Sequence, residues 1–230
     1  MIRQLGVIEA ILRNRFHFFH EIRDDVELPR KLRAMLLSSL TFFALYGAVM
    51  GSTHSVWQAL SSAVKLPVLF LATLFICSPT LYIFNVLFGS NQTLRQNVAL
   101  ILTAVTVTAV VLLSFAPITL FFLLTTSQYQ FFKLLNVGIF TAAGFMGVRF
   151  LSQGMRVVAE VGGEGDRNLH LVLRLWMLLY AFVGSQLAWT MRPFFGAPSI
   201  PFELFRQLGG NFYANIFASI GEILGFVTVQ

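Results

Sequence analysis

The sequence predicts an all-α fold, a polytopic transmembrane helical bundle of about five spans with amphipathic interfacial helices at both ends. Hydrophobic residues make up 57% of the 230 residues, and charged residues 11%, less than half of the roughly 25% usual in soluble chains. Mean hydropathy is +0.76. Two stretches, Leu66 to Phe88 and Asn97 to Leu124, contain no charged residue. Each exceeds the ~20 apolar residues that a helix needs to cross the hydrocarbon core, so together they predict a membrane hairpin.

Residues 1 to about 28 predict an amphipathic helix that is too charged to span. Its apolar residues recur at three- and four-residue spacing: Ile2, Leu5, Ile8, Leu12, Phe16 and Phe19. A basic amphipathic helix with aromatic residues is typical of a segment in the headgroup plane, and the alternative is docking on a partner helix. Asp24, Asp25 and Glu27, followed by Pro29, predict the break before the membrane.

The first span is expected from Ala34 to Ser52. Gly47 and Gly51 form a GxxxG pair within it, which favours close approach of another helix. The segment Thr53 to Lys65 is expected to form a short separate interfacial helix, with Trp57 at headgroup level.

The second span, Leu66 to Phe88, carries Pro79 near its middle. Proline removes a backbone donor and clashes with the preceding turn, so the helix is expected to kink or break there. A broken helix at membrane depth tolerates free carbonyls only if they face protein or water. Ser78, Pro79 and Thr80 are therefore candidate functional residues, with a purely structural kink as the alternative.

The third span, Gln96 to Phe115, carries Thr103, Thr106 and Thr108 on an otherwise aliphatic helix. Each threonine can donate to the carbonyl one turn earlier, so the three do not require a polar pathway. Pro117 is expected to kink the helix or to start a short second piece.

The fourth span, Phe131 to Leu151, contains small residues that suit close packing, among them Gly144 and Gly147. Asn136 within this span needs an interhelical partner or water. A polar loop is expected from Ser152 to Asn168, with a glycine-rich flexible tip.

The fifth span, Leu169 to Met191, contains a further small-xxx-small pair that begins at Gly184. Trp176 and Trp189 are expected to anchor this span at the membrane interfaces. Residues 192–230 then form an amphipathic, membrane-associated tail that lies on the membrane, dips into it or covers a neighbouring subunit.

The chain therefore divides into an amphipathic segment (1–33), a five-span bundle (34–191) and the tail. An amino terminus in the cytoplasm keeps the most basic segments inside, as the positive-inside rule favours. Anionic lipid and topogenesis explain the net charge of +6, so no nucleic acid partner is expected. Cys77, the only cysteine, lies in an apolar span and is expected to be a small buried hydrophobe.

Signatures of catalysis and of cofactor binding are nearly absent from the sequence. His17 and His20 lie close enough on a helix to share a metal, but no second pair of ligands supports such a site. Ionisable residues are almost missing from the middle of the spans, which disfavours a proton relay. We therefore expect a protein that is not an enzyme and holds no metal or cofactor.

Several stretches carry a resemblance to known proteins. The sequences PVLF (67–70), SPTLYIFNVLFGS (78–90), LRQ (94–96) and GSQLAWTMRPF (184–194) resemble a group of small polytopic bacterial inner-membrane proteins. This resemblance covers about residues 30 to 215, implies a multi-pass location in the bacterial inner membrane and carries no catalytic residue. The five-span plan with a cytoplasmic amino terminus is also similar to the Yip-type membrane proteins, which implies a membrane-organising or trafficking factor.

Two functions follow from these patterns. The first is a homo-oligomer that forms or gates an ion or small-solute path. The residues that would line the path are Ser78, Pro79, Thr80, Asn85, Thr103, Asn136 and Gln186. The alternative is a Yip-like scaffold or accessory subunit whose amphipathic ends organise membrane lipids or a partner complex. The residues assigned to helix packing are Gly47, Gly51, Gly144, Gly147 and Gly184.

Overall fold

The computed structural model is mostly helical where it describes the chain. It describes residues 2–52, 55–87, 92–126, 128–159, 164–195, 202–205 and 212–223. The helices are α1 (Ile2–Arg13), α2 (Arg15–Arg23), α3 (Leu28–Gly51), α4 (Val56–Leu87), α5 (Leu94–Thr125), α6 (Tyr129–Ala159), α7 (Glu164–Thr190) and α8 (Phe212–Ile223). Within this part of the chain, α3 to α7 are long and apolar enough to cross a membrane. The prediction of an all-α polytopic bundle is therefore confirmed.

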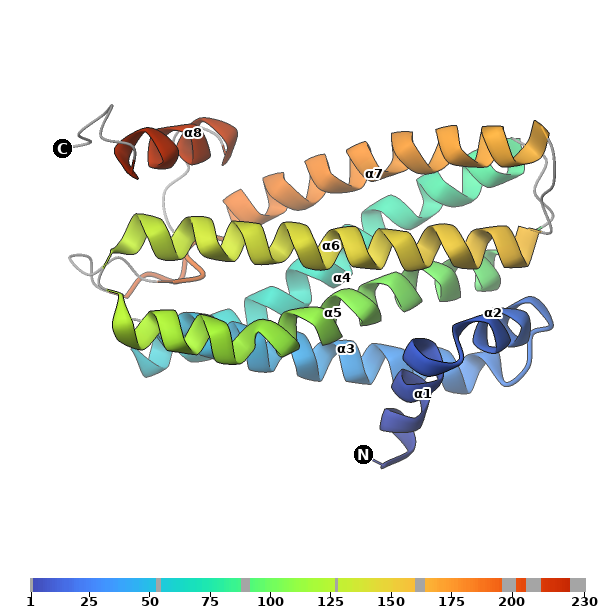
Figure 1. Cartoon of the computed structure of the whole chain (residues 1–230), viewed down its shortest axis with the longest axis horizontal. Coiled ribbons are helices and arrows are strands. Elements are labelled where there is room, and N and C mark those ends of the chain that lie inside the picture. Colours follow the sequence, from blue (N-terminus) through green and yellow to red (C-terminus); the bar gives the residue numbers. More distant parts are fainter. Residues whose placement is uncertain are drawn as a thin grey trace.

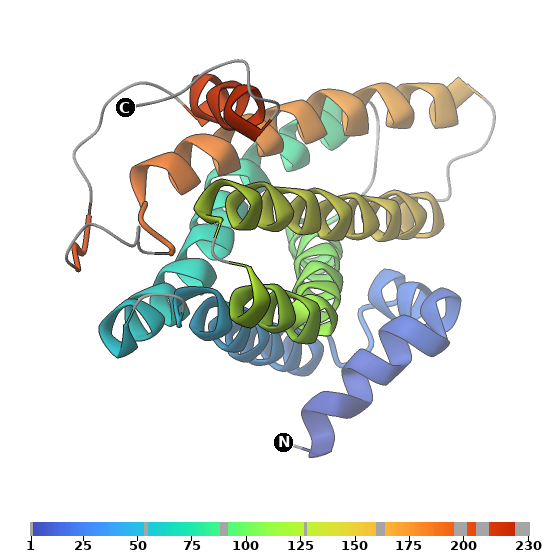
Figure 2. The same ribbon diagram turned by 60° about the vertical axis from the view of Figure 1, so that its left-hand side comes forward.

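The five long helices follow one another around the bundle in the order α7, α4, α3, α5, α6 (Figures 1 and 2). α3 packs along both α4 and α5, while α6 packs along α5 and α7 packs along α4. α6 and α7 are consecutive in the chain but touch only slightly. α5 is the most enclosed of the five long helices. In its most apolar stretch of 18 residues 67% is buried inside the bundle, whereas in that of α7 the share is 17%.

The first helices and the last helix lie at opposite ends of the bundle (Figure 1). α1 and α2 lie where α3, α5 and α7 begin, and this is called the N-terminal end below. α8 lies at the other end and contacts α6 and α7. Five spans therefore carry the chain from the side of α2 to the side of α8.

α4 and α5 pass through their prolines without ending. Pro67 and Pro79 lie inside α4, and Pro117 lies inside α5. The predictions of a separate interfacial helix before Lys65 and of a separate piece after Pro117 are therefore wrong. A helix in apolar surroundings gains from keeping its remaining backbone hydrogen bonds, and neighbouring helices can satisfy the carbonyls that a proline frees.

The polar loop predicted from Ser152 to Asn168 is mostly helix. α6 and α7 cover all of it except residues 160–163, which lie outside the described part of the chain and include the start of the predicted tip. Met155 and Val158 are buried, at 0% and 7% exposed. The apolar face of α6 therefore continues beyond the span that the charge pattern defines.

The N-terminal segment forms two helices instead of the one predicted, with Asn14 between them. Their well-buried side chains are Ile8, Ile11, Phe18, Phe19 and Ile22. Leu12 and Phe16, predicted on the same face as Phe19, are 47% and 57% exposed. The segment holds two overlapping apolar stripes, and the bundle covers only one of them.

Candidate functional site

Three helices meet at the proline in the middle of α4. Nε1 of Trp176 on α7 donates a hydrogen bond to the backbone oxygen of Cys77 at 2.9 Å. Nδ2 of Asn97 on α5 donates to the backbone oxygen of Ser78 at 3.4 Å. Both acceptors are carbonyls just before Pro79. Trp176 is only 2% exposed, so its prediction as an interface anchor is wrong, and it joins α7 to α4 inside the bundle.

The three candidates at this proline differ in exposure. Ser78 and Thr80 are half-buried, while Pro79 is exposed on the outside of α4. Cys77 is fully buried, which confirms that it is a small hydrophobe of the core. The contacts at this point are thus made mainly by the backbone of α4 and the side chains of its neighbours.

Asn85 belongs to a polar group at the N-terminal end of the bundle. Its Nδ2 donates to Oδ1 of Asn97 at 3.1 Å and to Oε1 of Gln92 at 3.4 Å. All three side chains are buried. Buried amides that bond one another fix a single register, so this group holds the end of α4 against the start of α5.

Asn136 belongs to a second polar group near the opposite end. The hydroxyl of Tyr46 on α3 donates to its Oδ1 at 2.9 Å, and the same hydroxyl lies 3.2 Å from Oγ1 of Thr119 on α5. Nδ2 of Asn136 donates to the backbone oxygen of Phe132. Asn136 therefore has the interhelical partner that its position in a span requires, and three helices share one buried network.

The threonines of α5 bond their own helix. Thr103, Thr106 and Thr108 each donate to the carbonyl four residues earlier, at 2.7 to 2.9 Å, as predicted. Oγ1 of Thr106 also lies 3.0 Å from Oγ of Ser39 on α3. Gln186, the remaining lining candidate, is half-buried on α7. The seven candidates therefore lie on four helices: Asn97 connects the Ser78 to Thr80 group with Asn85, while Thr103, Asn136 and Gln186 share no hydrogen bond with them in the described part of the chain.

The glycines assigned to helix packing differ in their surroundings. A Cβ at Gly47 or Gly51 would overlap the backbone of α4, and one at Gly147 would overlap α5. A Cβ at Gly184 would make an ordinary contact with Thr73 at 3.6 Å, and one at Gly144 would meet nothing within 4 Å. Among these glycines, those that allow a close backbone approach therefore lie between α3 and α4 and between α5 and α6.

A polar anchor in the first third of α4, at the end of the bundle opposite α2, was not predicted from the sequence. Nζ of Lys65 donates to the backbone oxygens of Pro193, at 3.2 Å, and of Leu204. Nε2 of Gln58 also donates to Pro193, at 2.9 Å. Lys65 is 4% exposed, although a lone lysine beside an apolar span is usually an interface charge. The carbonyls that bind it come from the tail, and no local pattern connects these segments.

α2 is docked on the bundle through a glycine that sequence reasoning also missed. A Cβ at Gly154 of α6 would lie 2.7 Å from both Cε1 of Phe19 and Cδ2 of Leu100. Nε2 of Gln96 donates to the backbone oxygen of Arg23 at 2.7 Å. The first turn of α5 and the last turns of α6 therefore form the seat for α2.

The corner between α2 and α3 is held by a half-buried ion pair. Nζ of Lys31 lies 2.8 Å from a carboxylate oxygen of Glu21 and donates to the backbone oxygen of Val26 at 2.9 Å. Asp25 and Glu27 have φ angles of 57° and 49°, in the left-handed region that L-residues seldom adopt. The acidic residues predicted to break the helix thus form a tight corner before Pro29.

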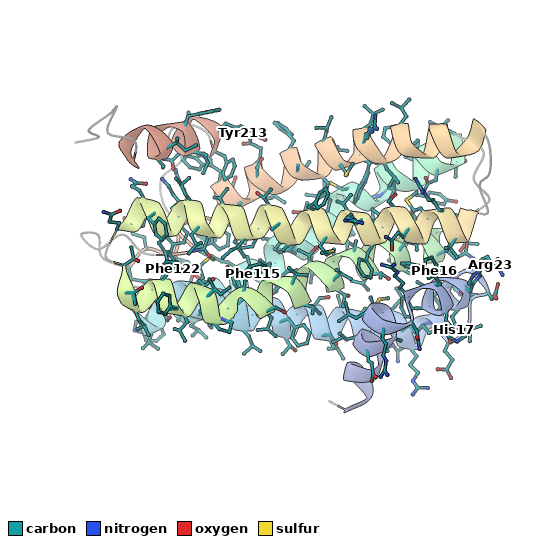
Figure 3. The ribbon with its side chains drawn as sticks, in the orientation of Figure 1. Phe16, His17, Arg23, Phe115, Phe122 and Tyr213 are labelled. Atoms are coloured by element: carbon teal, nitrogen blue, oxygen red, sulfur yellow. The ribbon has the colours of Figure 1, made fainter. Side chains whose placement is uncertain are left out.

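The outward edge of α1 and α2 is not covered by the bundle. Figure 3 shows Phe16 and His17 at the N-terminal end, far from Phe122 and Tyr213. The guanidinium of Arg15 lies 5.2 Å from the ring centre of Phe16. A separate cavity of about 370 Å³ lies between α1 and α3, where Val7 and Arg30 are among the residues that line it. The outward edge of α1 and α2 therefore offers exposed apolar and basic side chains.

The described residues contain no group of three or more metal-ligating side chains. Nε2 of His17 lies 3.4 Å from a carboxylate oxygen of Glu21, which already pairs with Lys31. The histidine pair that could share a metal on spacing alone is thus placed beside an ion pair of the α2–α3 corner.

Comparison with families of known proteins gives a match to the Yip1 domain over residues 10–185, more than half of the chain. No curated protein and no solved structure matches. The matched region runs from α1 to α7 and includes the seat of α2, the corner at Lys31 and both buried polar groups.

Proposed function

The chain belongs to the Yip1 domain family, and we propose that it is a membrane-organising scaffold or accessory subunit whose N-terminal helices bind a partner protein of a membrane complex. The proposal places it in the inner membrane of a bacterium with its amino terminus in the cytoplasm, in keeping with the basic residues of the first helices. The resemblance to Yip-type proteins, which are thought to organise membranes, supports the same role.

The observation that carries the proposal is the fixed position of α1 and α2 with their outer edge uncovered. Phe18 and Phe19 are each 1% exposed, whereas Leu12 and Phe16 are about half exposed. An apolar edge on a rigid seat needs no folding on binding, so it can bind a partner at small entropic cost. Exposed apolar residues rimmed by charges are typical of interaction sites.

The interior of the bundle supports a framework better than a path. The side-chain amides of Asn85 and Asn136 form hydrogen bonds with partners in the same chain, and the hydroxyl of Thr103 bonds a carbonyl of its own helix. Polar groups that are satisfied inside a bundle hold helices together. A conducting homo-oligomer would need such groups free to face a shared lumen.

The test is purification from membranes in a gentle detergent. Wild type should retain a partner protein, L12S/F16S should lose it, and the neighbouring exposed variant H20S should keep it. After a harsher detergent has removed the partner, the three proteins should elute at the same volume, because none of these side chains is buried. A wild type that purifies as a homo-oligomer and passes ions into liposomes above the level of empty vesicles would contradict the scaffold and support the path.

A further inference from the structure

Arginines at the N-terminal end fall into two groups. Three arginines in or next to α1 and α2 pair with acids: Arg13 with Glu9, Arg23 with Asp24 and Arg30 with Glu27. Four others, on α3, α5, α6 and α7, are exposed and have no acidic or polar partner among the residues that the structure describes. These are Arg33, Arg95, Arg149 and Arg174. These four arginines therefore have no counter-charge among the described side chains.

Arg149 and Arg174 lie at the same depth. Each is about ten residues, or roughly 15 Å of helix, from the connection between α6 and α7. The rise of α6 from Lys133 to Arg149 is about 24 Å, and that of α7 from Arg174 to its end at Thr190 is also about 24 Å, with no charged residue between. Both lengths approach the ~30 Å of the hydrocarbon core. The two arginines therefore mark the edge of the core at the N-terminal end.

Both arginines stand beside apolar side chains that face outward. Phe145, one turn from Arg149, is 65% exposed. Leu171 and Leu178, one turn to either side of Arg174, are 51% and 70% exposed. These side chains would contact acyl chains in a bilayer, so each guanidinium sits where acyl chains meet headgroups.

Carboxylates are absent from the described side chains around Arg149 and Arg174, since neither α6 nor the stretch Leu171 to Thr190 contains Asp or Glu. The acids of the connection between α6 and α7, Glu160, Glu164 and Asp166, lie eight to eleven residues away along the chain. A guanidinium at the hydrocarbon edge has lost part of its water and is stabilised by an anionic partner. A phosphate matches its fork with two parallel hydrogen bonds. Four arginines without an acidic partner among the described side chains add a field that favours lipids of net negative charge over zwitterionic ones.

We propose that Arg149 and Arg174 bind the phosphate groups of anionic phospholipids in the leaflet at the N-terminal end. The acyl chains of these lipids lie against the exposed apolar side chains of α6 and α7. Arg33 and Arg95 lie nearer the ends of their helices and strengthen the attraction from the headgroup region. The site uses residues of α6 and α7 and neither Leu12 nor Phe16, so its test is separate from that of the scaffold function.

The experiment is native mass spectrometry of the delipidated full chain, titrated with phosphatidylglycerol or phosphatidylcholine. Wild type should retain phosphatidylglycerol preferentially. R149Q/R174Q should weaken its binding about fivefold for each arginine removed, since one basic residue near an anionic surface contributes about that factor. R149K/R174K should bind with intermediate affinity, because lysine keeps the charge but loses the fork.

R13Q/R30Q is the matched control, because it removes the same charge from arginines that already have acidic partners. It should bind phosphatidylglycerol like wild type, and inorganic phosphate at millimolar concentration should not displace the lipid. Equal retention of the two lipids by wild type would overturn the proposal. So would an unchanged R149Q/R174Q, or an equal loss in the control. Elution volume and thermal midpoint check that all variants are folded.

Discussion

Trp176 donates its indole hydrogen to the backbone oxygen of Cys77 across 2.9 Å, and this bond joins α7 to α4 two residues before Pro79. α7 packs along α4, whereas it touches α6 and α8 only slightly. The bond therefore lies within the main attachment of the fifth span. In an apolar bundle, helix association gains little from the hydrophobic effect. Packing and interhelical hydrogen bonds such as this one then supply the free energy of association.

Replacing Trp176 with Phe should lower stability by about 1 kcal/mol, because an interhelical hydrogen bond is lost from a buried position. Thermal unfolding of the purified protein in detergent should show a lower midpoint. W189F is the matched control, because Nε1 of Trp189 is buried with no hydrogen-bond partner among the described residues. An equal shift in the two variants would rule out a specific role for the bond to Cys77.

The sequence predicts the spans well because hydrocarbon thickness sets the length of an apolar run. It predicts contacts poorly because a side chain's partner lies on another helix. Trp176 is a tryptophan near the end of a span, which is typical of an interface anchor. Only its hydrogen bond to the carbonyl of Cys77 on α4 shows that it lies inside the bundle. From the sequence, Lys65 likewise resembles a charge at the membrane interface. Its hydrogen bond to the carbonyl of Pro193 is known only from the structure. Asn136 is the opposite case, because an amide at membrane depth must have a partner.

Gly154 should be essential for the seat of α2. G154A places a Cβ against Phe19 and Leu100, so α2 should shift from the bundle and expose Arg23 to trypsin. Limited proteolysis of the protein in detergent should show faster cleavage between α2 and α3. G144A gives the same gain in helix propensity with open space around the new methyl group, so its cleavage rate should match wild type. Unchanged cleavage of G154A would show that α2 does not depend on this glycine.

The Glu21 and Lys31 pair should couple more strongly than an exposed pair of similar distance. Its side chains are 28% and 11% exposed, against 66% and 78% for Glu9 and Arg13. A double-mutant cycle with E21Q and K31M should give a coupling on the order of 1 kcal/mol, whereas E9Q and R13M should give about 0.3 kcal/mol. Unfolding midpoints in detergent supply the free energies. The first coupling should also survive added salt better, because a half-buried pair is less screened. Equal coupling free energies would mean that the Glu21 and Lys31 pair stabilises the corner no more than an exposed pair would.

Tyr46 should be worth more to stability than any exposed tyrosine, because its hydroxyl links Asn136 of α6 to Thr119 of α5 at a site with no exposure. Y46F leaves Oδ1 of Asn136 without its donor in an apolar interior, which should cost about 1 to 3 kcal/mol. Y213F, whose hydroxyl bonds Ser185 at an exposed position, is the control and should change little because water replaces the bond.

The double variant Y46F/N136L distinguishes a lost bond from lost packing. Removing both partners leaves no orphaned amide oxygen, so the double variant should be more stable than Y46F alone, even though it carries one more substitution. Thermal midpoints of wild type, Y46F, Y213F and Y46F/N136L in one detergent give the comparison. A double variant less stable than Y46F would mean that Asn136 contributes mainly by its shape and by its bond to the backbone oxygen of Phe132 within α6, so that Tyr46 contributes to the bundle by packing.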